Sequence, residues 1–158
     1  MTYETTLPAS VLFCLPFAPT PHGARLARVA AGGQLAAWGL PPGREAHDAA
    51  VLVVSELATN AARHGSRDGQ SLELRLLLLP DPAVLRVEVS DARGGTAPAP
   101  VPAPPGPVPV RTADSAEDGA ESGRGLLLVD ALATRWGWAP GPGTGKTVWA
   151  ELDLPVNA

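Results

Sequence analysis

A helical repeat of apolar residues between residues 44 and 64 is the strongest pattern in the chain. Apolar side chains recur there every three or four positions, which predicts a helix with one buried face. They are Ala46, Ala49, Ala50, Val53, Val54, Leu57, Ala58 and Ala61. Three polar residues, Glu56, Asn60 and His64, follow one another at intervals of four. At about 100° per residue, this polar stripe runs along the rim of the apolar face and not opposite it.

The polar stripe has a structural and a functional interpretation. In the structural one, Glu56 forms an ion pair with an arginine and Asn60 bonds to a nearby loop, an arrangement that is common and contributes little energy. In the functional one, the stripe lines a half-dry site. A carboxylate there can act as a general base, and an amide oxygen one turn later can ligate a hard cation such as Mg²⁺. The helix by itself favours neither interpretation.

Alternation of apolar and polar positions predicts two strands after this helix. Between residues 72 and 78, leucines occupy every second position and Glu73 and Arg75 separate the first three, as in a half-buried strand. Residues 84–90 place Leu85, Val87 and Val89 on one face and Arg86 and Glu88 on the other. Asp91 continues the apolar side of that strand, and an inward-facing acid needs a partner. It is either a cap at the end of the strand or a contact to a ligand.

The other predicted elements are shorter or less regular. Residues 9–17 form an edge strand at best, because Pro16 cannot donate to a sheet ladder. A helix over residues 23–38 ends at Gly39. Further along the chain we expect a short helix over 126–134, a strand over 135–139 and a final strand over 147–154.

Residues 94–122 have a composition that cannot pack a core. Seven prolines lie between Pro98 and Pro109, and a tract rich in aspartate and glutamate follows. Such a composition predicts a mobile loop with extended stretches. A loop of this length inside one domain is commonly functional or disordered.

Composition narrows the class of protein. A length of 158 residues fits a single domain, here residues 1–158. The net charge of −4 argues against a nucleic-acid binder. No apolar run approaches the ~20 residues that span a bilayer, and Cys14, the sole cysteine, excludes an intrachain disulfide and a cysteine-rich metal site. We therefore expect a cytoplasmic protein that contacts neither nucleic acid nor a membrane directly.

One phosphate-binding motif can be rejected. Residues 143–147 read Gly-Thr-Gly-Lys-Thr, like the end of a P-loop. That motif needs a glycine where this chain has Pro140, and it must lead into a helix. Residues 148–154 instead alternate as a strand, so we do not expect a P-loop NTPase.

Four motifs occur in a fixed order along the chain. They are residues 56–65 (Glu-Leu-Ala-Thr-Asn-Ala-Ala-Arg-His-Gly), 91–95 (Asp-Ala-Arg-Gly-Gly), 123–126 (Gly-Arg-Gly-Leu) and 145–147 (Gly-Lys-Thr). In this order they resemble the GHKL (histidine kinase/HSP90-like) ATP-binding superfamily, and most closely its small bacterial anti-sigma-factor serine/threonine kinases. The resemblance implies an α+β fold, a two-layer sandwich of the Bergerat type. Its mostly antiparallel sheet is covered on one face by helices.

The resemblance also implies ATP and Mg²⁺ as cofactors and a role for each matching residue. Asn60 would ligate the Mg²⁺ that bridges the phosphates, and Glu56 would be the general base. Asp91 would accept from the adenine amino group, with Thr147 near the base and close to Asp91. The remaining implied nucleotide-binding residues are His64, Gly65, Gly95, Gly123, Arg124, Gly125 and Leu126. Gly123 and Gly125 would form the phosphate-binding turn, and residues 96–122 would be a lid.

The resemblance implies a protein serine/threonine kinase that binds a sigma factor and phosphorylates an antagonist protein. It is compatible with a homodimer. Arg93 stands where the family's first glycine box, Asp-x-Gly-x-Gly, has its first glycine, and arginine tolerates positive φ poorly. This departure keeps a second hypothesis, a non-catalytic ATP-binding regulator, although the retained Glu56 favours the kinase. The catalytic domain of a histidine kinase is disfavoured, since the only histidines are His22, His47 and His64 and no long helical hairpin precedes the domain.

Overall fold

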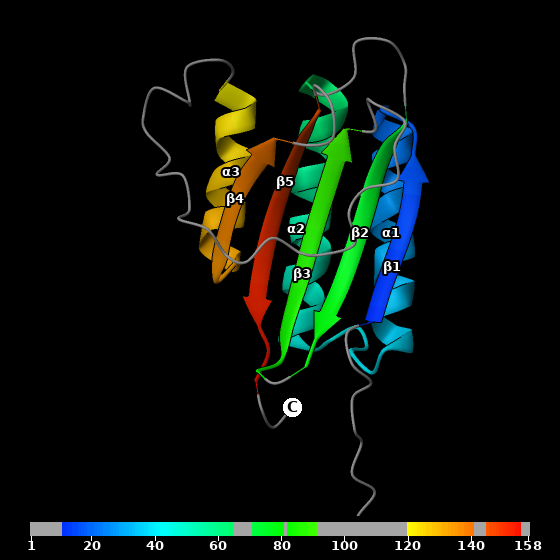
Figure 1. Ribbon diagram of the computed structural model, residues 1–158, viewed down its shortest axis with the longest axis vertical. Helices are drawn as coiled ribbons and strands as arrows, with labels where there is room; N and C mark the ends of the chain where they lie inside the picture. Colours follow the sequence, from blue (N-terminus) through cyan, green and yellow to red (C-terminus); the bar gives the residue numbers. More distant parts are fainter. Residues whose placement is uncertain (1–10, 65–70, 81, 92–119, 141–144, 156–158) are drawn as a thin grey trace, which may run out of the picture.

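Strands that are far apart in the sequence join into one antiparallel sheet (Figure 1). The computed structural model describes residues 11–64, 71–80, 82–91, 120–140 and 145–155, and of residues 64 and 120–125 only the backbone. The elements are β1 Val11–Phe17, α1 Pro21–Ala37, α2 Glu45–His64, β2 Leu72–Leu79, β3 Val84–Asp91, α3 Ala120–Leu132, β4 Arg135–Pro140 and β5 Lys146–Asp153. The described strands lie in the order β1-β2-β3-β5-β4, and each neighbouring pair is antiparallel.

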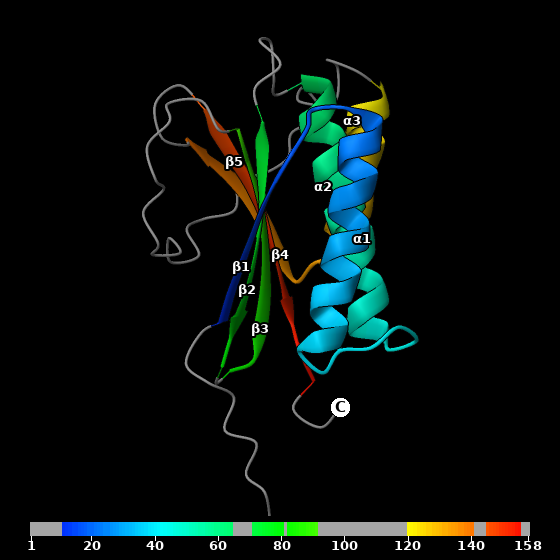
Figure 2. The ribbon, with the colours of Figure 1, turned by 90° about the vertical axis from the view of Figure 1, so that its right-hand side faces the viewer.

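The three helices of the described chain cover one face of this sheet (Figure 2). This two-layer α+β arrangement confirms the predicted fold class. The core lies between the layers, where the alternating leucines of β2 and valines of β3 meet the apolar face of α2. Leu74, Val87, Val53 and Leu57 are all at most 2% exposed. The hydrophobic period of each element therefore decides which of its sides is buried.

The ends of α1 show why the helix begins earlier than its apolar period predicts. Thr20 is the N-cap, and its Oγ1 accepts a hydrogen bond of 2.9 Å from the N–H of Gly23. Pro21 follows as the first helical residue, where its missing N–H carries no cost. At the other end, Gly39 has a φ of 91°, which favours glycine after a helix. The predicted start at residue 23 is therefore wrong by two residues.

The start of α3 differs more from the prediction. The helix begins at Ala120 and not at residue 126, so the backbone of Gly123–Gly125 is helical and does not form a turn in front of the helix. Each glycine costs about 1 kcal/mol in a helix interior, which is why the sequence suggested a later start. Burial of Val129 against the core offsets that cost. The last three residues of the predicted lid, 120–122, belong to this helix.

Two strand predictions hold with small shifts. β1 is an edge strand, and Pro16 lies on it, as its missing N–H requires. β5 begins at Lys146, one residue earlier than expected.

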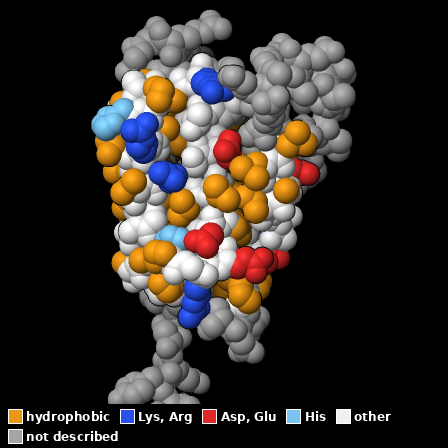
Figure 3. Space-filling model, turned by 180° about the vertical axis from the view of Figure 1, so that it is seen from behind, with side chains coloured by type: hydrophobic (Ala, Val, Ile, Leu, Met, Phe, Trp, Pro, Cys, Tyr) orange, Lys and Arg blue, Asp and Glu red, His pale blue; other side chains and the backbone are white. Residues whose placement is uncertain are grey.

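No helix among the described residues is long and apolar enough to cross a membrane. On the helix-covered side, hydrophobic side chains are interspersed with separate acidic and basic ones (Figure 3); the most exposed large ones on α1 are Leu26 and Val29.

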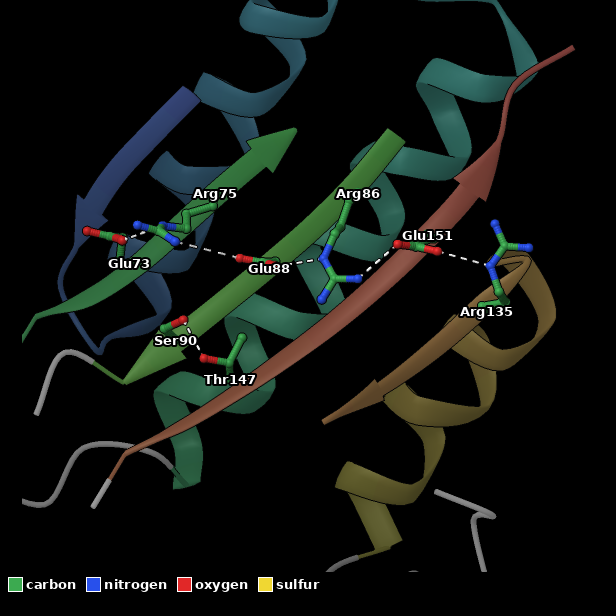
Figure 4. Close-up of polar contacts among 8 residues, drawn as sticks. All are labelled: Glu73, Arg75, Arg86, Glu88, Ser90, Arg135, Thr147 and Glu151. Carbon is green, nitrogen blue, oxygen red and sulfur yellow. Dashed lines mark hydrogen bonds and ion pairs between the residues drawn. The ribbon is translucent and has the colours of Figure 1, made fainter. Parts of the chain in front are cut away.

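The sheet face away from the helices carries a ladder of ion pairs (Figure 4). Arg86 is 2% exposed and joins two strands, with 2.6 Å from its Nε to Glu88 Oε2 and 2.8 Å from its Nη1 to Glu151 Oε2. Its guanidinium also lies 4.5 Å from the ring centroid of Trp149. The predicted orientation of Arg86 and Glu88, opposite the apolar side of β3, is confirmed. Their burial was not predicted.

Arg135 extends the ladder to the edge strand β4. Its Nε lies 3.0 Å from Glu151 Oε1, so one carboxylate receives an arginine from each side. Asp153 and Glu151 accept hydrogen bonds from Arg135 and raise its pKa above the ordinary value for arginine. On the other flank, Arg75 pairs with Glu73 at 2.9 Å. Charges of alternating sign therefore cross four neighbouring strands.

Candidate functional site

The polar stripe of α2 ends at one edge of the sheet. α2 packs on β3 more extensively than on any other described strand, and its C-terminal end lies at the edge where β3 ends and β5 begins (Figure 1). Glu56 and Asn60 are half-buried, as a position on the rim of the apolar face requires. Periodicity therefore predicted their placement correctly. His64 is the last residue of α2, and Gly65 lies outside the described residues.

Asn60 carries the most informative atom of this site. Its side-chain oxygen Oδ1 is buried, and among the described residues it has no hydrogen-bond partner. Buried polar atoms in native proteins are nearly always paired, so an orphaned acceptor points to a missing ligand. An amide oxygen is a suitable ligand for Mg²⁺. The structural interpretation, in which Asn60 bonds to a nearby loop, receives no support from the described residues.

The described residues contain no cluster of three or more histidine, cysteine, aspartate or glutamate side chains that could hold a metal by themselves. Mg²⁺ commonly takes only one or two protein ligands and completes its octahedron with water and substrate phosphates. The single amide oxygen of Asn60 therefore fits a Mg²⁺ ion that arrives with a phosphate-bearing ligand.

Asp91 lies at the same edge, as the last residue of β3. It pairs in register with Leu72 of β2 and is half-buried. Alternation along β3 places it on the side of Val87 and Val89, which is the helix-covered side of the sheet. The structure thus brings the ends of α2 and β3, with Asn60 and Asp91, to a common edge. The inward parity of Asp91 expected from the sequence is confirmed.

Thr147 does not join this group. It pairs with Ser90 in register, and the two hydroxyl oxygens lie 2.8 Å apart (Figure 4). Ser90 and Thr147 both lie on the face that carries Arg86, away from the helices. Since Asp91 has the opposite parity, the structure does not bring the Thr147 hydroxyl to the side of Asp91. The expectation that Thr147 lies near the adenine base stays a prediction.

The glycine motifs are only partly described. Gly123, Arg124 and Gly125 lie in the first turns of α3, where the backbone is helical. Leu126 follows them and packs half-buried against the core. The nitrogen Nε1 of Trp136 in β4 donates to Asp130 Oδ1 at 2.8 Å and holds α3 against the sheet. Gly95, Arg93 and lid residues 96–119 lie outside the described residues.

Sequence reasoning missed the ion-pair ladder and the bond between Trp136 and Asp130. The ladder had a signal, because arginine and glutamate alternate at a spacing of two in both β2 and β3. Pairing across strands depends on register, which the alternation alone does not provide.

Comparison with known proteins supports the fold. The sequence model of the family described as the histidine kinase-like ATPase domain matches residues 17–152. The crystal structure of the RsbU and RsbW domains of Rv1364c from Mycobacterium tuberculosis is similar, with a TM-score of 0.61 and 19% sequence identity. The similarity covers 91% of this chain and 32% of the Rv1364c chain, so this chain spans about a third of the length of that structure. At this identity the likeness shows the fold alone. No curated protein matches the chain significantly.

Proposed function

Because the chain belongs to the family of histidine kinase-like ATPase domains, we propose that it binds Mg²⁺-ATP where α2 and β3 end and phosphorylates a serine or threonine of a partner protein. The observation that carries the proposal is the buried Oδ1 of Asn60, which has no hydrogen-bond partner among the residues that the structure describes. It lies one turn from Glu56 on the same rim of α2. A metal ligand and a base within one turn are the two groups that a phosphoryl transfer requires of this helix.

Each described residue of the site has a distinct role in this proposal. Asn60 holds the magnesium, which neutralises charge on the phosphates when it is bound. Asp91 accepts a hydrogen bond from the amino group of adenine and orients the base. Glu56 takes the proton from the attacking hydroxyl of the substrate protein. Glu56 is half-buried and not fully enclosed, which this role requires.

The proposed partners follow from the motif resemblance and from the likeness to a structure that contains an RsbW domain. We assign the chain to anti-sigma-factor kinases, which bind a sigma factor and phosphorylate an antagonist protein, and we place it in the cytoplasm. Arg93, which stands in place of the first glycine of the Asp-x-Gly-x-Gly box, keeps open a second candidate, a nucleotide-binding regulator without catalysis. The two candidates differ in one measurable property, phosphoryl transfer.

Substitutions on α2 test the proposal. Asn60→Ala removes the metal ligand, so both ATP affinity and phosphoryl transfer should fall. Glu56→Ala should leave ATP affinity close to that of the wild type and lower transfer ~10²–10⁴-fold, the usual contribution of a positioned general base. Affinity is measured by calorimetry with Mg²⁺. Transfer is measured from labelled ATP to proteins that the chain captures from its source cells.

Ser55→Ala is the matched control, because Ser55 lies on the side of α2 opposite the apolar face and should change neither quantity. If the wild type binds ATP but labels no captured protein, the regulator is the correct candidate. If Glu56→Ala transfers phosphate normally, the carboxylate is structural. Failure of the wild type to bind millimolar Mg²⁺-ATP would contradict the nucleotide site itself.

A further inference from the structure

Lys146, the only lysine of the chain, is the first residue of β5. Side chains alternate along a strand, so Lys146 lies on the same side as Val148 and Ala150, the helix-covered side. Thr147, the next residue, lies on the opposite side with Ser90. The rejected P-loop motif had left this lysine without a role.

The register of the sheet places Lys146 beside Asp91. β3 and β5 pair so that Ser90 is opposite Thr147 and Val89 opposite Val148. Continuing this register by one residue puts Lys146 directly opposite Asp91, on the same face. The Cβ atoms of residues opposite each other in an antiparallel pair are about 4.5–5.5 Å apart. Lys146 is exposed, and its side chain has no hydrogen-bond or ion-pair partner within the described part of the chain.

We infer that Lys146 is the second residue that contacts the base of the bound nucleotide, where its ammonium group donates to a ring nitrogen of adenine. This inference rests on the proposed function, because it assumes that Asp91 accepts from the adenine amino group. In adenine, ring nitrogens that accept hydrogen bonds lie on either side of the carbon that carries this amino group. An acceptor from β3 and a donor from β5, side by side, match that pattern.

The same pair of side chains discriminates against guanine. Guanine has a carbonyl oxygen where adenine has its amino group, and this oxygen would face the carboxylate of Asp91. Two acceptors cannot share a hydrogen bond, so the base would lose one contact and bury an unpaired acceptor. Lys146 thus adds affinity for the ring, and Asp91 determines which purine is accepted.

Lys146→Met tests the inference, since it keeps a long side chain and removes the donor. It should weaken Mg²⁺-ATP binding by about tenfold or more, the usual effect of losing a hydrogen bond from a charged group. Two ATP analogues, with N1 or N7 replaced by carbon, identify the acceptor. One of them should bind the wild type about tenfold more weakly than ATP. The variant should bind that analogue and ATP equally well.

Arg44→Met is the control, because it removes one exposed positive charge at the start of α2, the end far from the site. It should change ATP affinity less than twofold. Unchanged ATP affinity in Lys146→Met would overturn the inference and leave the proposed function intact. An equal loss for ATP and for both analogues would also overturn it, because the lysine would then act on the phosphates. A wild type that binds no ATP would instead contradict the proposed function.

Discussion

At the scale of single residues, the site depends on which side of an element each side chain occupies. Asn60 and Glu56 could be placed from the sequence, because the helical period fixes the rim of the apolar face. The side of Thr147 did not follow from the motif, because a motif specifies positions along the chain and not sides of a strand. The correct side was available in the sequence, since the apolar alternation of Val148 and Ala150 puts Thr147 opposite them. Lys146, the residue before Thr147, lies on the helix-covered side together with Asp91.

Arg86 supports a residue-scale prediction about stability. Arg86→Met leaves Glu88 and Glu151 buried without the cation between them, at 7% and 5% exposure. Breaking a buried ion pair by removing one partner typically costs about 3–5 kcal/mol, so the free energy of unfolding in urea should fall by about this amount. Arg135→Met is the comparison, because that side chain is 34% exposed. It should cost no more than about 1 kcal/mol. Equal losses would mean that the burial of Arg86 is energetically irrelevant.

At the scale of elements, hydrophobic period identified the two long helices and the strands, and local chemistry set their ends. Thr20 and Gly39 delimit α1 through a cap and a positive φ. The start of α3 could not be predicted, because two glycines within three residues indicate a turn in any single sequence. Packing of the later turns of α3 against the core extends the helix back through them. Tertiary contacts there override local preference.

Gly125 tests what the glycines of α3 contribute. In a helix, Gly125→Ala should raise the free energy of unfolding by roughly 0.5–1 kcal/mol, because alanine loses less backbone entropy on folding. If this glycine also lets the backbone approach phosphate groups, the same variant should bind Mg²⁺-ATP more weakly. Chemical denaturation and calorimetry measure the two effects separately. A variant that is more stable and binds ATP normally would show that the glycine has no role in binding.

At the scale of the whole molecule, the α+β class and the two-layer arrangement agree with the expectation from motif resemblance. Alternation alone predicted strands but not their order, because strand order depends on contacts between distant segments. The insertion of β5 between β3 and β4 is such a contact. The ion-pair ladder depends on it, since Arg86 and Glu151 are 65 residues apart in the sequence. The register of strand pairing, more than residue type, determines which side chains meet in the ion-pair ladder and in the proposed contacts to adenine.

The insertion of β5 beside β3 also has a consequence for how fast the chain folds. Strands β1 to β3 and helices α1 and α2 come from one continuous half of the sequence, whereas β5 reaches β3 only after residues 92–119 and α3 have been crossed. Closing a loop costs about 0.6 kcal/mol more for each doubling of its length. If this closure precedes the transition state, replacing residues 96–112 with a few glycines and serines should increase the refolding rate about 1.5-fold. Stopped-flow refolding would measure the change, and an unaltered unfolding rate would show that the native sheet does not depend on the length of its longest connection.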